Sequence, residues 1–171
     1  MKGYIHVYTG SGKGKTTAAL GLALRAAGAG KRVFIAQFIK EKRYSEIEAI
    51  QKYISDITIK QYGRGCFIIK NPTWQDIAAA GIGLAEVTGI LASGQYDVVV
   101  LDEACIAVYF NLFTLEELIE AINKRSEETE IIITGRNAHE KLIEIADLVT
   151  EMKEVKHYYT KGVKARKGIE Y

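Results

Sequence analysis

Cysteine is scarce in this chain. Of its 171 residues only Cys66 and Cys105 are cysteines, and they lie far apart in the sequence. Two isolated cysteines cannot build a four-cysteine zinc element, and their separation matches no other metal-binding spacing. We expect both to be buried and inert, in a protein of a reducing cytoplasm.

Long apolar runs are also missing from the sequence as we interpret it. The chain starts directly with strand-like residues, without a signal-type stretch, and no run approaches the ~20 apolar residues of a membrane span. The net charge of +2 gives no overall attraction to nucleic acid. We therefore expect a cytoplasmic protein whose partners include neither a membrane nor a nucleic acid.

Repeats, linkers and low-complexity tracts are absent too, and a chain of this length with 48% hydrophobic residues has enough material for one sizeable core. We therefore expect a single domain over residues 1–171.

Strand-like segments alternate with helix-like ones along the chain. The expected strands are 3–9, 32–40, 56–62, 96–101 and 130–134. The expected helices are 18–24, 45–54, 76–93, one after a capping box of Thr114 and Glu117, and a short one through residue 146 capped by Asn137 and Glu140. This alternation predicts an α/β fold in which helices cover both faces of a mostly parallel sheet.

A glycine-rich loop between the first strand and the first helix carries the clearest functional signal. Residues 9–17 read TGSGKGKTT. A strand, a glycine loop and a helix in this order point backbone N–H groups and the positive end of a helix at a phosphate. The predicted phosphate-binding residues are Gly10, Ser11, Gly12, Lys13, Gly14, Lys15, Thr16 and Thr17. Lys15 is expected to reach the terminal phosphates of ATP, and the Thr16 hydroxyl to ligate Mg²⁺ or Mn²⁺. A flexible turn that happens to contain glycines is the alternative, which the flanking strand and helix disfavour.

The loop departs from the usual phosphate-binding pattern at one position. The pattern places a glycine at position 9, where this chain has Thr9 and its first glycine follows one residue later. We expect the loop to wrap around the phosphates differently.

Two further strand ends carry charged residues. Asp102 and Glu103 end an apolar strand, and they should lie beside the glycine loop if that strand neighbours the first. There both could hold the metal ion; without the loop, a solvated strand end would be an equal interpretation. Arg136 follows another strand and could bind phosphate, with an ordinary surface arginine as the alternative. Residues 153–167 combine lysines with aromatic residues, which fits a solvated face or a nucleotide-contacting edge.

Taken together, these segments resemble the ATP:corrinoid adenosyltransferases of cobalamin synthesis and salvage. The resemblance covers nearly the whole chain. It is carried by the loop with threonine at its first position, QFIK at 37–40, YDVVVLDE at 96–103, TGR at 134–136, ADLVTEM at 146–152, KH at 156–157 and the final GIEY. It implies a P-loop NTPase-like, RecA-like fold.

The resemblance implies that the 5′-deoxyadenosyl group of ATP is transferred to the cobalt of a reduced corrinoid, with tripolyphosphate as the other product. Co(I) is itself the nucleophile, so no protein nucleophile is needed. Lys15 and Glu103 are the expected catalytic residues. The implied partners are ATP, the corrinoid, an electron donor such as a flavoprotein, and a second copy of the chain in a homodimer.

The corrinoid side of the site is implied by fewer residues. Phe67 falls in a stretch similar to one that packs against the corrin ring in the family, and ordinary core packing is the alternative. His157, in the KH pair, is a possible nucleotide contact. We expect the chain to lack the segment that in many members precedes the first strand and helps cover the corrinoid.

Two other functional classes compete with this hypothesis. In a nucleoside kinase, Glu103 would act as a base instead of a metal partner; thymidine kinases of similar architecture usually carry the four-cysteine zinc element that two cysteines cannot form. A nucleotide-binding regulatory protein without turnover is the third class.

Overall fold

The computed structural model describes residues 2–39, 44–64 and 71–171. Its strands are β1 (Ile5–Thr9), β2 (Val33–Phe38), β3 (Ile57–Tyr62), β4 (Val98–Asp102), β5 (Glu130–Thr134) and β6 (Leu148–Glu151). Its helices are α1 (Lys15–Gly28), α2 (Ser45–Tyr53), α3 (Trp74–Ser93), α4 (Ala104–Tyr109), α5 (Leu115–Asn123), α6 (Glu140–Ile145) and the 3₁₀ helix η1 (Tyr158–Lys161).

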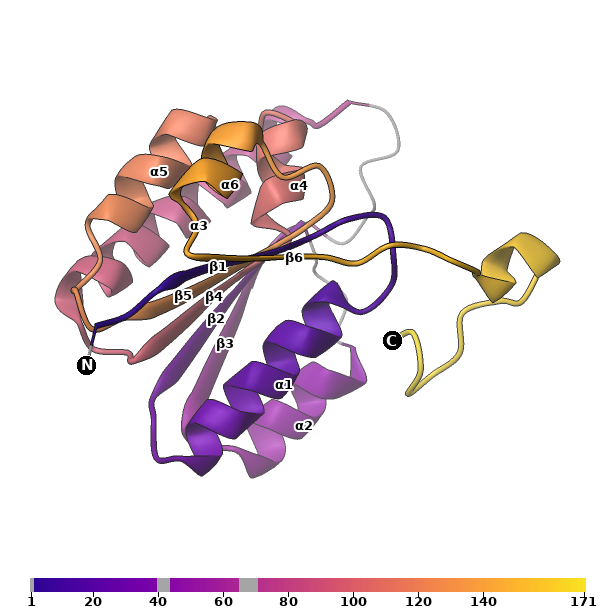
Figure 1. Ribbon diagram of the computed structural model, residues 1–171, viewed down its shortest axis with the longest axis horizontal. Coiled ribbons are helices and arrows are strands. Elements are labelled where there is room, and N and C mark those ends of the chain that lie inside the picture. Colours follow the sequence, from indigo (N-terminus) through magenta and orange to yellow (C-terminus); the bar gives the residue numbers. More distant parts are fainter. Residues whose placement is uncertain (1, 40–43, 65–70) are drawn as a thin grey trace.

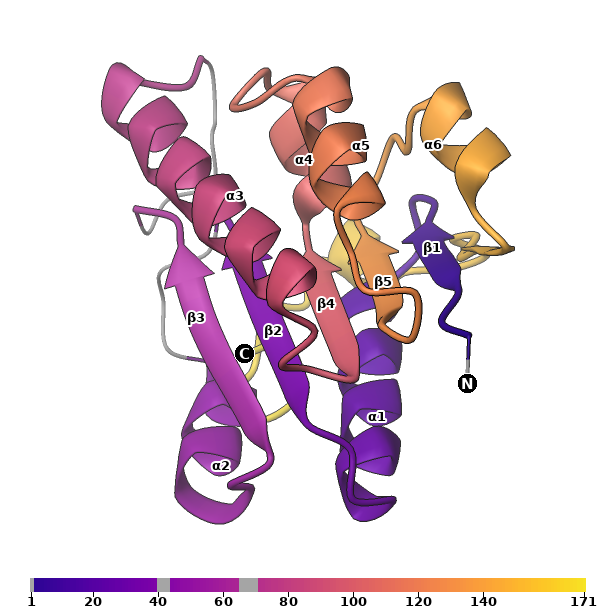
Figure 2. The ribbon, with the colours of Figure 1, turned by 90° about the vertical axis from the view of Figure 1, so that its left-hand side faces the viewer.

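All six strands form one parallel sheet in the order β3-β2-β4-β5-β1-β6. Helices α1 and α2 cover one face, and α3, α4, α5 and α6 lie on the other (Figures 1 and 2). This is the predicted α/β fold. Because every strand runs in the same direction, all the strand ends that carry Asp102, Thr9 and Thr134 meet at one edge of the sheet.

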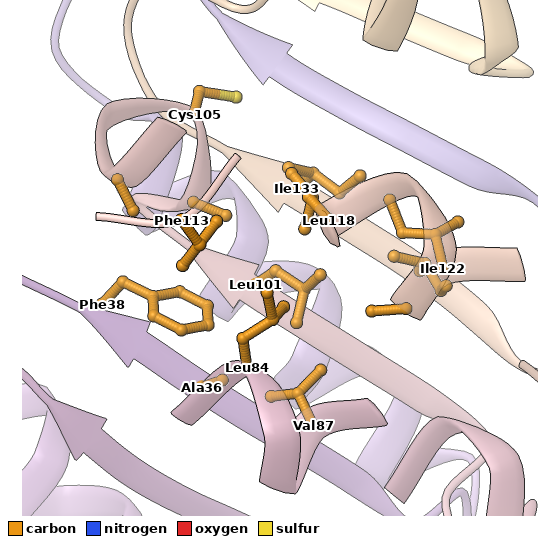
Figure 3. Close-up of a cluster of buried hydrophobic side chains, with 14 of the residues drawn as sticks. Ala36, Phe38, Leu84, Val87, Leu101, Cys105, Phe113, Leu118, Ile122 and Ile133 are labelled. Carbon is orange, nitrogen blue, oxygen red and sulfur yellow. The ribbon is translucent and has the colours of Figure 1, made fainter. Parts of the chain in front are cut away.

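The central strands are apolar except near their carboxyl ends, as expected for strands whose two faces are both covered. Every residue of β2 and of β4 is buried. On the side of α3 and α5, Phe38, Leu101 and Ile133 from the sheet pack with Leu84 and Leu118 from the helices (Figure 3). A smaller cluster under α1 and α2 is built mostly from alanine and isoleucine, and the small side chains let α1 lie close to the sheet.

Three elements and two helix caps were not predicted, namely α4, β6 and η1, and the caps of α3 and α6. The short helix α4 is apolar throughout, but its six residues are too few to show a helical period, and the edge strand β6 exposes all four of its side chains, so it has no buried face to mark it. The cap of α6 is His139, whose ring accepts a hydrogen bond from the Lys141 N–H, so the assignment of Asn137 was wrong. Asn137 instead has a left-handed backbone, with φ of 55°. The Thr114–Glu117 capping box at α5 is confirmed.

Helix α3 corrects a second expectation. In the part of the chain that the structure describes, it is the single helix long and apolar enough to cross a membrane by length and composition. The sequence analysis missed this run because Asp76 and Glu86 interrupt it without making it polar. One side of α3 packs into the core through Leu84, Val87 and Leu91. In this structure α3 is therefore a helix that covers one face of the sheet.

Two glycines of α3 allow a matched test of this packing. A β-carbon at Gly83 would lie 2.5 Å from Cγ of Tyr62, whereas at Gly89 nothing lies within 4 Å. We expect Gly83→Ala to lower the free energy of unfolding by about 1–3 kcal/mol through overpacking. Gly89→Ala should raise it by roughly 0.5–1 kcal/mol, because alanine favours a helix. Urea unfolding of both variants checks this, and equal effects at the two positions would contradict the α3–β3 packing.

Candidate functional site: the phosphate loop and the buried carboxylate beside it

The glycine loop runs from the end of β1 to the start of α1. Thr9 is still part of β1, where it pairs with Glu151 of β6 and accepts a hydrogen bond from the Met152 N–H at 2.8 Å. The first turn therefore comes at Gly10, with φ of 96°, and the last at Gly14, with φ of 118°. The strand keeps Thr9, and this explains why the first glycine is displaced by one position.

The loop packs tightly against the chain that follows β6. A β-carbon at Gly10 or Gly12 would lie 2.4 or 2.7 Å from the carbonyl oxygen of Met152. The Gly12 N–H donates to that same oxygen at 2.7 Å. This N–H is therefore engaged within the protein, and our expectation for phosphate binding moves to the N–H groups at the start of α1.

The start of α1 is suited to bind an anion. Among the described residues no side chain caps it, and its first turn contains no acidic residue. The helix dipole is therefore not neutralised at this end by a carboxylate of its own first turn. Thr17 lies exposed in this first turn, and Ser11 is exposed in the loop.

Lys15 is the buried cation of the site. Its side chain folds across the loop, and Nζ donates to the carbonyl oxygens of Gly10 and Gly12, each at 2.8 Å. Burial lowers the pKa of Lys15, and Arg136 lowers it further, while the nearby carboxylates of Glu103 and Asp102 oppose the shift. Because burial makes the charged form of Lys15 less favourable, a negative group such as a phosphate that binds next to it would stabilise the ammonium group.

Asp102 is the buried anion of the site, and its side chain accepts three hydrogen bonds. The donors are the Thr16 hydroxyl of α1 at 2.8 Å, the Thr134 hydroxyl of β5 at 2.7 Å and Nε2 of Gln37 from β2 at 3.0 Å. Strand β4 does not neighbour β1, because β5 lies between them. Asp102 nevertheless reaches the loop helix directly, through the Thr16 hydroxyl, and Thr134 binds the same carboxylate from the intervening strand.

The polar row extends further across the sheet. Gln37 stands in register with Asp102 on one side and with Gln61 on the other, and Nε2 of Gln61 donates to Oε1 of Gln37 at 3.1 Å. Gln37 is fully buried. The sequence analysis assigned no role to Gln37 or Thr134. The available signal was a polar side chain inside an otherwise apolar strand, which is buried only with partners.

These side chains fit a magnesium or manganese ion. No group of three or more His, Cys, Asp or Glu side chains suitable for a metal occurs within residues 2–39, 44–64 and 71–171. Mg²⁺ in nucleotide sites does not need one, since it is held by one or two protein oxygens, several waters and the phosphates. The Thr16 hydroxyl donates to Asp102, and a hydroxyl oxygen can accept as well as donate, which is the property that a cation ligand needs.

Glu103 directly follows Asp102 and has an unusual backbone. Its φ of 61° is in the left-handed region, and its N–H donates to the Thr134 hydroxyl at 3.0 Å. Such a conformation in a non-glycine residue is unfavourable and is found preferentially at functional sites. Its predicted roles, in catalysis and in metal binding, stay predictions.

The turn after β5 lies at the same edge. Arg136 is exposed there, close enough to Lys15 to affect its pKa. The preceding Gly135 has φ of 142°, and a β-carbon on it would lie 2.8 Å from Cβ of Cys105. Burial raises the pKa of Cys105 to about 12, which agrees with an inert thiol. Cys66 falls outside the described residues.

Of the other predicted residues, His157 and the Lys13 ammonium group lie apart from this cluster. His157 caps η1 in the C-terminal tail, where its ring accepts a hydrogen bond from the Tyr159 N–H at 3.0 Å. The Lys13 ammonium contacts the tail, so any contact of Lys13 with phosphate would come from its backbone. Phe67 lies outside the described residues, and its predicted role is not tested.

Comparison with known proteins decides the family. The model of the family described as ATP:corrinoid adenosyltransferase BtuR/CobO/CobP matches residues 1–171. The chain belongs to this family. It is 38% identical to the corrinoid adenosyltransferase of Escherichia coli K12 over 99% of this chain and 86% of that protein. The identity to the corrinoid adenosyltransferase CobA of Salmonella typhimurium is also 38%, with the same coverage. It is 34% to the corrinoid adenosyltransferase of Pseudomonas aeruginosa, over 99% and 84%.

Thr134 offers a test of the Asp102 cluster in this adenosyltransferase. We expect Thr134→Val to lower the free energy of unfolding by about 1–3 kcal/mol, because it removes one donor from a buried carboxylate and the acceptor of the Glu103 N–H. The matched control is Thr129→Val, which removes a single bond from a buried hydroxyl to the carbonyl oxygen of Tyr96. It should cost only about 0.5–1.5 kcal/mol. Urea unfolding compares them, and a larger loss at Thr129 would argue against Thr134 as a support of Asp102.

Proposed function

We propose that this corrinoid adenosyltransferase transfers the 5′-deoxyadenosyl group of ATP to the Co(I) centre of a reduced corrinoid and releases tripolyphosphate. Its family membership, over the whole chain, makes it an enzyme that adenosylates corrinoids with ATP. The observation that carries the leaving-group part of the proposal is the buried Lys15 at the uncapped start of α1, next to Asp102.

The proposed reaction requires little covalent chemistry from the protein. An electron pair of Co(I) forms the bond to C5′ of the ribose, and the C5′–O bond breaks with its electrons going to the triphosphate. The protein therefore has to align C5′ with cobalt and to neutralise the charge that develops on the leaving oxygen. Lys15 and the N–H groups at the start of α1 supply positive charge and donors for that purpose.

The metal ion and the remaining contacts are part of the same proposal. Thr16 and Asp102, with Glu103 alongside, would hold Mg²⁺ or Mn²⁺, Asp102 doing so through waters. When bound, the ion neutralises part of the triphosphate charge. We assign Arg136 to a phosphate oxygen, His157 to the nucleotide and Phe67 to the corrin ring. The displaced first glycine supports a loop that holds triphosphate as a leaving group instead of presenting its γ-phosphoryl group for transfer.

We further propose that residues 1–171 act as a single nucleotide-binding domain, in a cytoplasmic homodimer. Dimers are usual in proteins that the sequence resembles. A separate electron donor such as a flavoprotein is proposed because a corrinoid must be reduced to Co(I) before it can attack carbon.

One assay tests the reaction. The protein is incubated with ATP, Mg²⁺, a corrinoid and a strong chemical reductant, and we expect the spectrum of the adenosylated corrinoid together with one equivalent of tripolyphosphate. Separate orthophosphate and pyrophosphate in the absence of a phosphatase would contradict the intact leaving group. ADP formed with a nucleoside acceptor would favour a kinase instead.

Lys15 is the residue to change first. We expect Lys15→Ala to lower kcat/KM for ATP by roughly 10²–10³-fold, because a buried cation at the leaving group is lost. Lys31→Ala is the matched control, since Lys31 is an exposed lysine beyond the far end of α1, and its turnover should equal that of the parent. Initial rates over a range of ATP concentrations measure both. Parent-like turnover in Lys15→Ala would refute the assigned phosphate site.

A further inference from the structure

The C-terminal tail, residues 152–171, returns to the phosphate loop after leaving the sheet. Beyond β6 it runs outward to η1 and then turns back, so that the C-terminus lies near α1 and α2 (Figure 1). Its last residues contact the body of the protein. The backbone oxygen of Tyr171 accepts a hydrogen bond from the Ser45 hydroxyl at 3.2 Å, and the Tyr171 ring lies 6.5 Å from that of Tyr44.

Lys13 is the link between this tail and the loop. Its Nζ donates to the Tyr158 hydroxyl at 3.0 Å, to the carbonyl oxygen of Ile169 at 3.1 Å and to Oε1 of Glu170 at 2.9 Å. A lysine ammonium has three donors, and the tail accepts all of them. The side chain of the first loop lysine is therefore committed to the protein, while the second, Lys15, faces the loop interior.

Glu170 is the centre of the tail's contacts. Its side chain accepts hydrogen bonds from Lys13, from the Tyr158 hydroxyl, and from the backbone and guanidinium of Arg166. Only 16% of this side chain is exposed, against 42% for Lys13. These donors hold the pKa of Glu170 far below its ordinary value, so the carboxylate stays charged over the whole working range of pH.

The tail therefore holds the loop at two points. Backbone hydrogen bonds between Met152 and the loop residues Thr9 and Gly12 fix the first half of the loop. The side-chain contact of Lys13 with Glu170 fixes the loop again just before its last glycine, Gly14. We propose that the tail pre-organises the loop for ATP, with Glu170 as a positioning residue that acts through Lys13. This rests on the proposed function only in taking ATP as the ligand of the loop. A loop that is ordered before ATP arrives loses less conformational entropy on binding.

The test measures ATP affinity directly, by titration calorimetry of the full chain with MgATP and without corrinoid. We expect Glu170→Gln to raise the Kd roughly three- to tenfold. In turnover assays the KM for ATP should rise by a similar factor, while kcat and the KM for the corrinoid stay close to parent values, as for a loss of ground-state binding. Glu154→Gln is the matched control, an exposed glutamate of the same tail, and its Kd should equal the parent's.

Variants of Lys13 test the route of the effect. Lys13→Met should also raise the Kd, and adding Glu170→Gln to it should cause no further increase, because both changes break the same contact. Lys13→Arg, which keeps the positive charge opposite Glu170, should restore most of the affinity. Parent-like affinity in Glu170→Gln would overturn the proposal, as would additive effects in the double variant. A lower melting temperature with an unchanged Kd would overturn it too, because that outcome indicates a structural role alone.

These results are separable from the proposed reaction. If the parent protein binds MgATP but produces no adenosylated corrinoid, the proposed function fails, whereas the affinities of the variants still decide the role of the tail. If the parent adenosylates corrinoids and Glu170→Gln binds ATP equally well, only the positioning role fails.

Discussion

The site depends on one buried carboxylate with three hydrogen-bond donors. Asp102 is 1% exposed, and an unpaired charge at such a depth would cost several kcal/mol. Its donors come from α1, β2 and β5, so the charge is stable only when these elements and β4 are all in place. The loop helix is thereby fixed to the sheet through its second residue, Thr16, next to the buried Lys15. Folding and the assembly of the site are consequently the same event at this point.

The parallel sheet makes this convergence possible. Strands β2, β4 and β5 end at one edge, and the register brings Gln61, Gln37 and Asp102 to the same level on three neighbouring strands. Each polar side chain in that row is the partner of the next, so the buried part of the row is satisfied without water. The central strands are otherwise apolar, and the polar row begins where they reach the carboxyl edge. Along each central strand, the apolar residues that pack the core come first and the polar residues of the site come near the carboxyl end. The core therefore supports the site without contributing side chains to it.

The elements that could be predicted from the sequence are those with a strong local pattern. The apolar strands β2, β4 and β5, the glycine loop and the Thr114–Glu117 cap were all predicted, because periodicity and capping are properties of neighbouring residues. Strand β6 was missed since its side chains are exposed, and it is defined only by its pairing with β1. The same pairing holds Thr9 in the strand. A departure from the usual loop pattern therefore has its cause 142 residues away, at Glu151, where no local pattern can reveal it.

The two loop lysines show the same limit at the level of single side chains. In the sequence, Lys13 and Lys15 are two cations separated by a glycine, and both were predicted to bind phosphate. In the structure, α1 starts at Lys15, whose side chain turns inward to the carbonyls of Gly10 and Gly12, where burial lowers its pKa. Lys13 precedes the helix and points to the tail carboxylate instead. A buried ammonium bonded to neutral carbonyls gains most when an anion arrives, whereas one already paired with Glu170 gains little. The two lysines thus differ in the acceptors that surround them, carbonyl oxygens for Lys15 and the Glu170 carboxylate for Lys13.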